Sequence, residues 1–337
     1  MAAYASEMNS LRLRVPSSSI YYGALEWGLG NPKKVACYHG WLDNAASFSY
    51  LGPKLAANGY HVVAVDHLGH GRSSHLPYES SYSYFSGVST IDRVLSCLAN
   101  ERGEEWTKPH AIIGHSMSTG QSMLFASAFP ERVNKLVLIE GFGPLTAKEE
   151  DAATKLRNAL VAESAWMQKL SSSSPHDLRP PKVYETVQKA IDTRMFVVGK
   201  YPGNQSISKE AATAIVCRGV SDANVSVDEV NSEGPDTLPT DAFPVRFRHD
   251  TRLTLPSPMY LSPRQVLGYT KSIEAPTLLI TAENGWPPSD PEAMTERLEV
   301  MGDKLTRVRV GGSHHCHLDS DTAEETSAEI LDFLSRD

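Results

Sequence analysis

The sequence predicts an α/β fold: a mostly parallel sheet with helices on both faces and an inserted, mainly helical cap. Short runs of almost wholly apolar residues recur at 61–65, 111–113 and 133–139, as in strands that are buried on both faces. Between these runs, apolar residues recur at helical spacing. After residue 143 the apolar runs stop, and they resume only near residue 276. The alternation of strands and helices favours right-handed crossovers and therefore parallel pairing.

The first part of the chain follows this alternation from element to element. Its first two strands, joined by a turn rich in Pro and Ser, are expected to pair as an antiparallel hairpin. The first helix has a typical C-terminal stop at Asn58-Gly59. In order, the expected elements are strands at 11–15, 20–27 and 35–38, a helix at 45–57, a strand at 61–65, a helix at 84–100, a strand from 110, a helix behind it, and a strand at 133–139.

The rest of the chain divides into the cap and the end of the core. We expect residues 144–267 to form the cap, without buried strands, and residues 1–143 and 268–337 to form the core. Asp321 and Glu324 have the spacing of a capping box for the last helix. The expected cap elements are helices at 148–170, 183–198 and 209–218, a loop at 171–181 and a long stretch rich in Pro and Asp up to 258; the core resumes with a strand at 276–281, a helix at 291–301, a strand at 305–310 and a helix to 333.

Composition describes an ordinary globular chain and argues against several classes of function. Of 337 residues, 41% are hydrophobic and 21% are charged. The net charge is -8 and the pI is near 5.9, with no stripe of Lys and Arg, so a nucleic-acid partner is not expected. No apolar run approaches the roughly 20 residues that cross a bilayer, and the first residues lack the order of a signal peptide. We therefore expect no membrane span and a cytoplasmic location.

Cysteine usage gives no sign of a disulfide framework or a zinc site. Cys37, Cys97, Cys217 and Cys316 are scattered without paired spacing. Histidines do cluster around Cys316, but adjacent residues in one loop rarely converge on one ion without an outside carboxylate. We therefore expect no metal and no cofactor.

The stretch from 111 to 120 carries the clearest chemical signal. An apolar strand meets Gly114, and the residues that follow return at helical spacing, so Ser116 lies at a sharp turn from strand to helix. This resembles a nucleophile elbow, in which a strained turn exposes a serine hydroxyl. Its usual pattern is Gly-x-Ser-x-Gly, and here Ser118 takes the last position. Ser118 itself is an alternative nucleophile, with Gly120 as the final glycine, but Ser116 fits the pattern better.

Several motifs together resemble the α/β-hydrolase superfamily along nearly the whole chain. They are His-Gly-Trp at 39–41, the glycine-rich loop at 66–73, the elbow at 114–118, the strand at 276–280 and the histidine loop at 312–317. With Ala-Ser-Phe after the first motif and Arg-His-Asp near residue 250, the chain looks most like the serine hydrolase-like proteins. The resemblance implies the α/β-hydrolase fold and catalytic groups in the chain order serine, acid, histidine.

The resemblance also implies a base for the serine, whose hydroxyl is inert at neutral pH without one. His314 is the first choice because it follows the last strand and a pair of glycines, where the family carries its catalytic histidine. His315 and His317 are neighbours that compete for this role.

The acid has several candidates. The family's usual position holds Gly285, so the acid must come from elsewhere. Glu140 ends an apolar strand and matches a branch similar to haloalkane dehalogenases, which supply the acid one strand earlier. A lone carboxylate there is costly without a partner such as the histidine. Glu283 and Asp290 are alternatives, and Glu140 could also simply reach solvent.

An oxyanion hole needs two backbone N–H groups aimed at the developing negative charge. The family geometry implies Met117, directly after the nucleophile, and Trp41. It also places His39, Gly40 and His115 beside the substrate pocket. We therefore expect the first motif and the elbow to meet at one end of the sheet.

Two other groups of polar residues have a structural interpretation or stay open. Asp66 and Arg72 are expected to pin the glycine-rich loop near the mouth of the site. His249 and Asp250 either line the pocket or tie the cap to the core.

The combined sequence observations predict a cofactor-independent serine hydrolase acting on a small-molecule carboxylic ester or other acyl substrate. Ser116, His314 and Glu140 are the expected nucleophile, base and acid. Epoxide hydrolases and dehalogenases need an aspartate at position 116, which is absent. The alternative is a small-molecule receptor on the same fold with a vestigial triad. A further possibility is hydrolysis of a thioester, an amide or a carbon–carbon bond with the same groups.

Overall fold

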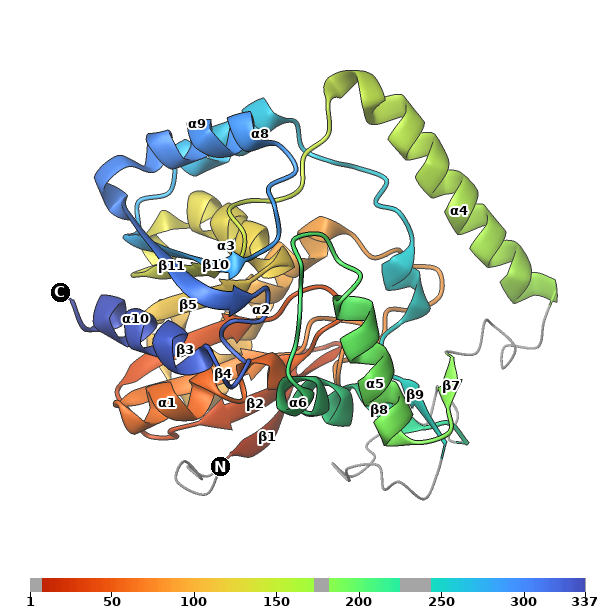
Figure 1. Cartoon of the computed structure of the whole chain (residues 1–337), viewed down its shortest axis with the longest axis horizontal. Helices are drawn as coiled ribbons and strands as arrows, with labels where there is room; N and C mark the ends of the chain where they lie inside the picture. The colour runs from red at the N-terminus through yellow and green to blue at the C-terminus, as the bar shows by residue number, and fades with distance from the viewer. Residues whose placement is uncertain (1–7, 173–181, 225–243, 337) are drawn as a thin grey trace.

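The computed structural model describes residues 8–172, 182–224 and 244–336, and its centre is an eight-stranded sheet (Figure 1). The strand order is β1-β2-β4-β3-β5-β6-β10-β11, in which β1–β2 and β2–β4 pair antiparallel and all other neighbours pair parallel. The strands are β1 (Asn9–Arg14), β2 (Tyr21–Trp27), β3 (Lys33–Tyr38), β4 (Tyr60–Val65), β5 (Ala111–His115), β6 (Leu136–Ile139), β10 (Thr277–Asn284) and β11 (Leu305–Ser313). The expected hairpin and mostly parallel sheet are confirmed.

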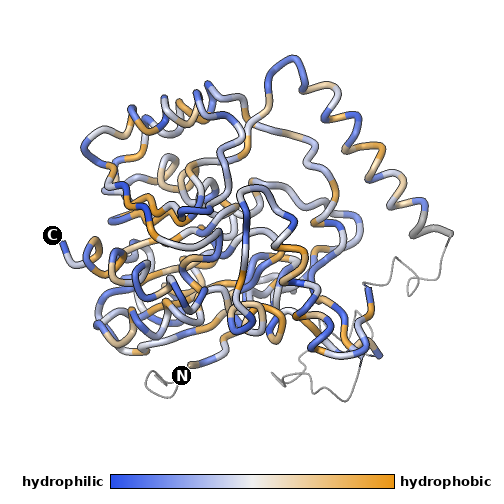
Figure 2. The backbone as a smooth tube through the Cα atoms, viewed as in Figure 1, coloured by the Kyte–Doolittle hydropathy of each residue, from blue (hydrophilic) through white to orange (hydrophobic). Residues whose placement is uncertain are grey.

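Helices cover both faces of this sheet. One face packs against α1 (Leu51–Ala57) and α10 (Ala323–Ser335), and the other against α2 (Tyr84–Arg102), α3 (Met117–Ala128) and α9 (Pro291–Met301). Successive residues of each strand point to opposite faces, so a strand contributes to both apolar layers. The hydropathy of the backbone accordingly peaks along the central strands (Figure 2). None of the described helices is long and apolar enough to cross a bilayer.

The segment between β6 and β10 contains helices and a small second sheet. The helices are α4 (Ala152–Ser172), α5 (Val187–Val198), α6 (Lys209–Gly219) and α8 (Pro263–Lys271), and α4 lies along the outer edge of the molecule, away from the main sheet (Figure 1). The second sheet has the order β7-β9-β8, formed by β7 (Val183–Tyr184), β9 (Val245–Phe247) and β8 (Val220–Asp222).

This second sheet corrects the expected start of one helix. The sequence predicts a helix from residue 183, but Val183–Tyr184 is a strand, and α5 begins only after Thr186, whose hydroxyl accepts the Lys189 N–H. The sequence also predicts no strands here comparable to the buried strands of the core, and these three are only two or three residues long. Strands of two or three residues are too short to produce a periodic pattern. Much of the expected 171–181 loop and of the stretch up to 258 lies outside the described residues. The predicted boundary at 267/268 falls within α8, and the division into core and cap stays a prediction.

The helix expected at 45–57 is confirmed in its second half and at its end, because α1 spans Leu51–Ala57 and Asn58 is its C-cap, whereas Ala45–Phe48 form a 3-10 turn. One further local prediction is wrong. Asp321 does not cap the last helix, because α10 begins after Thr322, whose own hydroxyl donates to the Cys316 carbonyl. Glu324 instead accepts a hydrogen bond from Tyr50 Oη at 2.8 Å. The four cysteines are free thiols, as expected.

Candidate active site

Ser116 occupies the turn between β5 and α3. Its φ is 53°, a left-handed conformation that non-glycine residues rarely adopt and that is characteristic of strained functional sites. The Ser116 N–H donates to the Ile139 carbonyl at 2.9 Å, which ties the turn to the neighbouring strand β6. A Cβ on Gly114 would lie 2.6 Å from the Ser118 carbonyl oxygen, so the turn requires a glycine there. The local sequence thus produces the predicted elbow.

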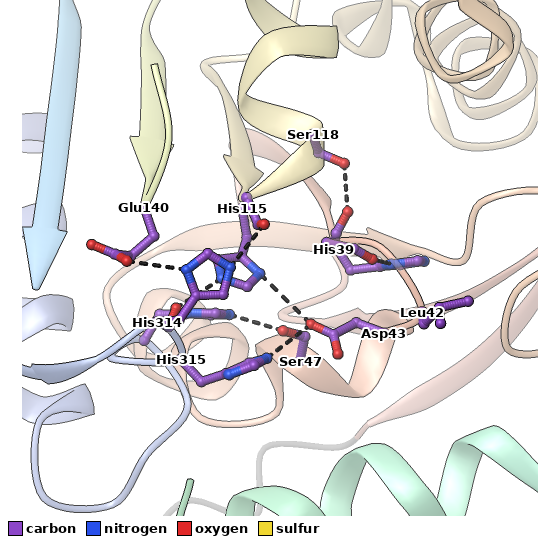
Figure 3. A network of polar contacts seen from close by, with 12 residues as sticks. His39, Leu42, Asp43, Ser47, His115, Ser118, Glu140, His314 and His315 are labelled. Atoms are coloured by element: carbon purple, nitrogen blue, oxygen red, sulfur yellow. Dashed lines mark hydrogen bonds and ion pairs between the residues drawn. The ribbon is translucent and has the colours of Figure 1, made fainter. Parts of the chain in front are cut away.

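His314 connects Ser116 to Glu140. The His314 Nε2 atom lies 2.8 Å from Ser116 Oγ. Its Nδ1 atom lies 3.0 Å from Glu140 Oε2, and Figure 3 shows this contact as a dashed line. A carboxylate beside Nδ1 requires the proton on that nitrogen, which leaves Nε2 free to accept the serine proton. The His314 main chain is held as well, since its N–H donates to Gln205 Oε1 at 2.8 Å and its carbonyl accepts from His115 Nε2 at 2.9 Å. The structure therefore brings the three first-choice residues together.

The Glu140 side chain is held as a hydrogen-bond acceptor directly after β6. Its carboxylate accepts the Ala282 N–H at 2.6 Å and the Trp286 N–H at 2.9 Å. A Cβ placed on Gly285 would lie 2.4 Å from Glu140 Oε1. The glycine at the family's usual acid position therefore leaves the space that the Glu140 carboxylate fills.

The alternative acids have other roles. Glu283 is exposed on β10, where its carbonyl accepts a hydrogen bond from Arg309. Asp290 caps α9, and its side chain accepts the Ala293 N–H at 3.0 Å. Neither carboxylate has a described contact with His314.

A second carboxylate, Asp43, organises the histidines behind His314. Asp43 Oδ2 lies 3.1 Å from His315 Nε2 and 3.7 Å from His115 Nδ1 (Figure 3). Its Oδ1 atom forms an ion pair with Arg194 of α5. Burial opposes ionisation of Asp43, but Arg194 and His315 hold its pKa well below the usual range. Burial also lowers the pKa of His315, and it lowers that of His317, which contacts Ser47, to about 3. The competing histidines are thus buried neutral groups engaged elsewhere.

The two expected oxyanion donors belong to residues near the nucleophile. Met117 is its neighbour in the sequence, and the main chain that leads to Trp41 is its neighbour in space. Met117 is the first residue of α3, directly after Ser116. A Cβ on Gly40 would lie 3.1 Å from Ser116 Cβ, so the main chain that leads to Trp41 passes beside the nucleophile. The Trp41 indole is half exposed and donates to the Leu253 carbonyl at 3.0 Å.

Ser118 is unsuited to the role of nucleophile. Its side chain is fully buried, and its hydroxyl donates to the His39 carbonyl at 2.5 Å. Figure 3 shows this hydroxyl directed toward His39 and away from His314. Ser116 is therefore the serine that faces the histidine.

The glycine-rich loop after β4 is pinned by an ion pair that the sequence did not reveal. Asp66 accepts the Arg72 N–H at 2.9 Å, as expected of a loop anchor, but its guanidinium partner is Arg218 of α6, at 2.7 Å. Burial would raise the pKa of Asp66, but Arg218 lowers it below its usual value.

The two residues near 250 differ in role. Asp250 forms an ion pair with Arg252, and its N–H donates to the Gly69 carbonyl at 2.8 Å, so it ties this segment to the loop after β4. His249 lines a small pocket beside Asp43 and Arg194. Among the described residues, no cluster of His, Cys, Asp or Glu has metal-binding geometry.

Sequence reasoning missed Asp43 with Arg194, and Asp66 with Arg218. Asp43 lies just after the His-Gly-Trp motif, and Asp66 begins the glycine-rich loop. The arginines lie on helices of the inserted segment among many other charged residues, and no local pattern marks them as partners. Only the placement of α5 and α6 over the sheet brings the ions together.

Comparisons with known proteins identify the family of this chain. A family model described as "alpha/beta hydrolase fold" matches residues 35–320. A serine hydrolase-like protein of Danio rerio is 28% identical over 91% of this chain and 83% of its own, and one of Dictyostelium discoideum is 26% identical over 94% and 79%. The crystal structure of a hypothetical protein from Pseudomonas aeruginosa PAO1 superposes with a TM-score of 0.77 at 32% identity, covering 97% of this chain and 99% of that one. The chain therefore belongs to the α/β-hydrolase family.

Proposed function

We propose that this protein is a serine hydrolase that cleaves carboxylic esters of small molecules through an acyl-enzyme, without a cofactor. The observation that carries the proposal is the continuous contact from Ser116 Oγ to His314 Nε2 at 2.8 Å and from His314 Nδ1 to Glu140 Oε2 at 3.0 Å. Hydrolases of the family and the serine hydrolase-like relatives make the general activity the expected one.

In the proposed reaction, Ser116 Oγ attacks the acyl carbon while its proton moves to His314 Nε2. Glu140 keeps the imidazole oriented and stabilises the imidazolium that forms. The oxyanion of the tetrahedral intermediate accepts hydrogen bonds from the Met117 and Trp41 N–H groups. His314 then gives the proton to the leaving alcohol oxygen. Water attacks the acyl-enzyme by the same route in reverse, which releases the acid and restores Ser116.

The receptor hypothesis has three supports: Ser118 in the elbow, Gly285 at the usual acid position, and the long irregular cap. The contacts of the first two weaken it. Ser118 makes buried hydrogen bonds beside the elbow, and Gly285 makes room for Glu140. Both departures from the family pattern are compatible with an assembled set of catalytic groups.

Intact-protein mass spectrometry after treatment with a fluorophosphonate tests the proposal. We expect one adduct per chain, located at Ser116 by peptide fragmentation and absent from Ser116→Ala. A folded protein that forms no adduct contradicts the proposal and favours the receptor. The substrate class is tested with an ester, a thioester and an anilide that share one acyl group, and we expect kcat/KM to be highest for the ester.

A further inference from the structure

Ser118 belongs to a buried hydrogen-bond relay at the nucleophile elbow, two residues after Ser116. Its hydroxyl lies 2.5 Å from the His39 carbonyl oxygen and 2.8 Å from His67 Nε2, and both partners are buried. A third acceptor, Gln121 Oε1, is more distant at 3.3 Å. The elbow pattern has a glycine at this position, which could make none of these contacts.

The direction of the relay follows from the number of available protons. The His39 carbonyl can only accept, so it takes the single hydroxyl proton of Ser118. The Ser118 oxygen must then accept from His67, which places a proton on His67 Nε2. Burial holds the pKa of His67 well below its usual value, so its ring is neutral. The result is His67 Nε2–H to Ser118 Oγ–H to the His39 carbonyl, a chain in which each bond polarises the next.

The His39 ring also makes hydrogen bonds that orient the next peptide, Gly40–Trp41. Its Nε2 accepts the His67 main-chain N–H at 3.0 Å, so the proton of the neutral ring is on Nδ1. Nδ1–H donates to the Gly40 carbonyl at 2.7 Å, and the Asp43 N–H donates to the same oxygen at 3.2 Å. The Gly40 carbonyl therefore has one defined direction.

That direction fixes the neighbouring N–H group. In a trans peptide the carbonyl and the N–H point to opposite sides, so the orientation of the Gly40 carbonyl sets that of the Trp41 N–H. The Gly40 backbone also lies against Ser116, because a Cβ added to Gly40 would be only 3.1 Å from Ser116 Cβ. The relay thus acts on the peptide that carries one expected oxyanion donor.

We propose that Ser118 and His67 are positioning residues that, through His39, hold the Gly40–Trp41 peptide in the orientation needed for oxyanion binding. This inference rests on the proposed serine-hydrolase function. Neither side chain touches the reacting atoms, and their effect is on a donor that is already oriented before the substrate arrives. Such preorganisation affects the transition state more than the bound substrate.

Kinetics of Ser118→Ala and His67→Leu on a p-nitrophenyl ester test the proposal. We expect kcat to fall by about tenfold to 100-fold, less than the roughly 10²- to 10³-fold loss of an entire oxyanion donor, with KM within about twofold. His67→Gln keeps an N–H donor near the position of Nε2 and should retain most of the activity. Ser122→Ala is the matched control, because Ser122 is buried one turn further along α3 and its hydroxyl has no hydrogen-bond partner among the described residues.

A pair of inhibitors separates positioning from general damage. A trifluoromethyl ketone becomes a tetrahedral oxyanion on the serine, whereas the matching alcohol cannot. In Ser118→Ala we expect the affinity for the ketone to fall by the same factor as kcat/KM and the affinity for the alcohol to stay unchanged.

Three results would overturn the relay: an unchanged kcat in folded Ser118→Ala, an equal loss of affinity for both inhibitors, or, if Ser118→Ala does not fold, a His67→Gln variant no more active than His67→Leu. A wild-type protein that forms no adduct at Ser116 overturns the proposed function instead. The two failures are therefore distinguishable.

Discussion

Two adjacent histidines, His314 and His315, each pair with a buried carboxylate, yet the two pairs have different chemistry. The histidine-to-carboxylate distances are almost equal, 3.0 Å to Glu140 and 3.1 Å to Asp43. The difference lies at the second ring nitrogen. His314 Nε2 meets a strained serine, whereas His315 Nδ1 is buried with no hydrogen-bond partner among the described residues.

The two carboxylates, Glu140 and Asp43, also differ in the groups that contact them. Glu140 is held by two backbone N–H groups, which orient it without neutralising its charge. Asp43 is neutralised by Arg194, a cation from outside the main sheet. In the proposed mechanism only the His314–Glu140 pair supports proton transfer, whereas the contacts of the His315–Asp43 pair join the inserted segment to the core.

Neutralising Glu140 should have the largest effect on activity. In Glu140→Gln we expect kcat to fall by roughly 10³- to 10⁴-fold with little change in melting temperature, because His314 loses the acceptor that fixes its tautomer. Steady-state kinetics and calorimetry on the same preparation measure both quantities. Near-normal kcat would remove Glu140 from the mechanism.

Neutralising Asp43 should have the opposite effect, a large loss of stability with a small change in kcat. Asp43→Asn leaves Arg194 buried without its counter-ion, so we expect the free energy of unfolding to fall by about 3 to 5 kcal/mol. The remaining folded protein should keep kcat within about tenfold, since no proton passes through His315. Urea denaturation and active-site titration check this.

The double variant Asp43→Asn/Arg194→Met sharpens this comparison, because it removes the unpaired charge. It should recover part of the lost stability. If Asp43→Asn instead reduces kcat as far as Glu140→Gln does, the contrast between the two pairs fails.

Gly285 offers a way to disturb Glu140 without altering its charge. In Gly285→Ala the new Cβ would lie 2.4 Å from Glu140 Oε1, so the carboxylate must move away from His314. We expect kcat to fall by about tenfold to 100-fold, since a displacement near 1 Å has effects of this order. Gly268→Ala, where a Cβ has open space, is the matched control. Equal kcat in the two variants would contradict the proposed packing.

The buried neutral histidines predict a loss of stability in acid. Burial lowers the pKa of His317 to about 3 and that of His249 to about 4. Below about pH 6.5 these histidines bind protons in the unfolded state but not in the folded state. Their contribution to the free energy of unfolding is therefore complete above that pH and is lost as the pH falls. Each of these two histidines should reduce the free energy of unfolding by about 2 kcal/mol between pH 6.5 and 5.

Denaturant titrations at several pH values test this. The slope of stability against pH should be smaller in His317→Gln, which keeps a side-chain amide for Ser47 but cannot titrate. Equal stability at pH 7 and 5 in the parent protein would show that these side chains are not buried as described.

The sequence predicted the main sheet well because most of its strands are apolar runs, and such runs indicate strands that are buried on both faces. The same reasoning placed Ser116 and Glu140 at the ends of such strands, whereas the choice of His314 came from the family resemblance, because the strand before it is not an apolar run. It failed where an element depends on contacts with residues that are distant in the sequence. The two- and three-residue strands around Val183, Val220 and Val245 leave no periodic pattern.

The roles of Ser118 and Gly285 were unpredictable for a related reason. Each departs from a family pattern, and a departure alone is compatible with decay or with compensation. Only the distance from Gly285 to the Glu140 carboxylate, and from Ser118 to the His39 carbonyl, distinguishes the two interpretations. Asp321 shows the converse error, because a correct spacing was present without the predicted contact.

The ion pair between Asp66 and Arg218 has a consequence for local unfolding. It is buried, and α6 cannot separate from the loop after β4 without breaking it. A cost of about 3 kcal/mol limits molecules with α6 detached to under about 1%. We therefore expect the amide hydrogens of α6 and of this loop to exchange with solvent together, and a variant that loses the pair should raise the exchange rate of both segments.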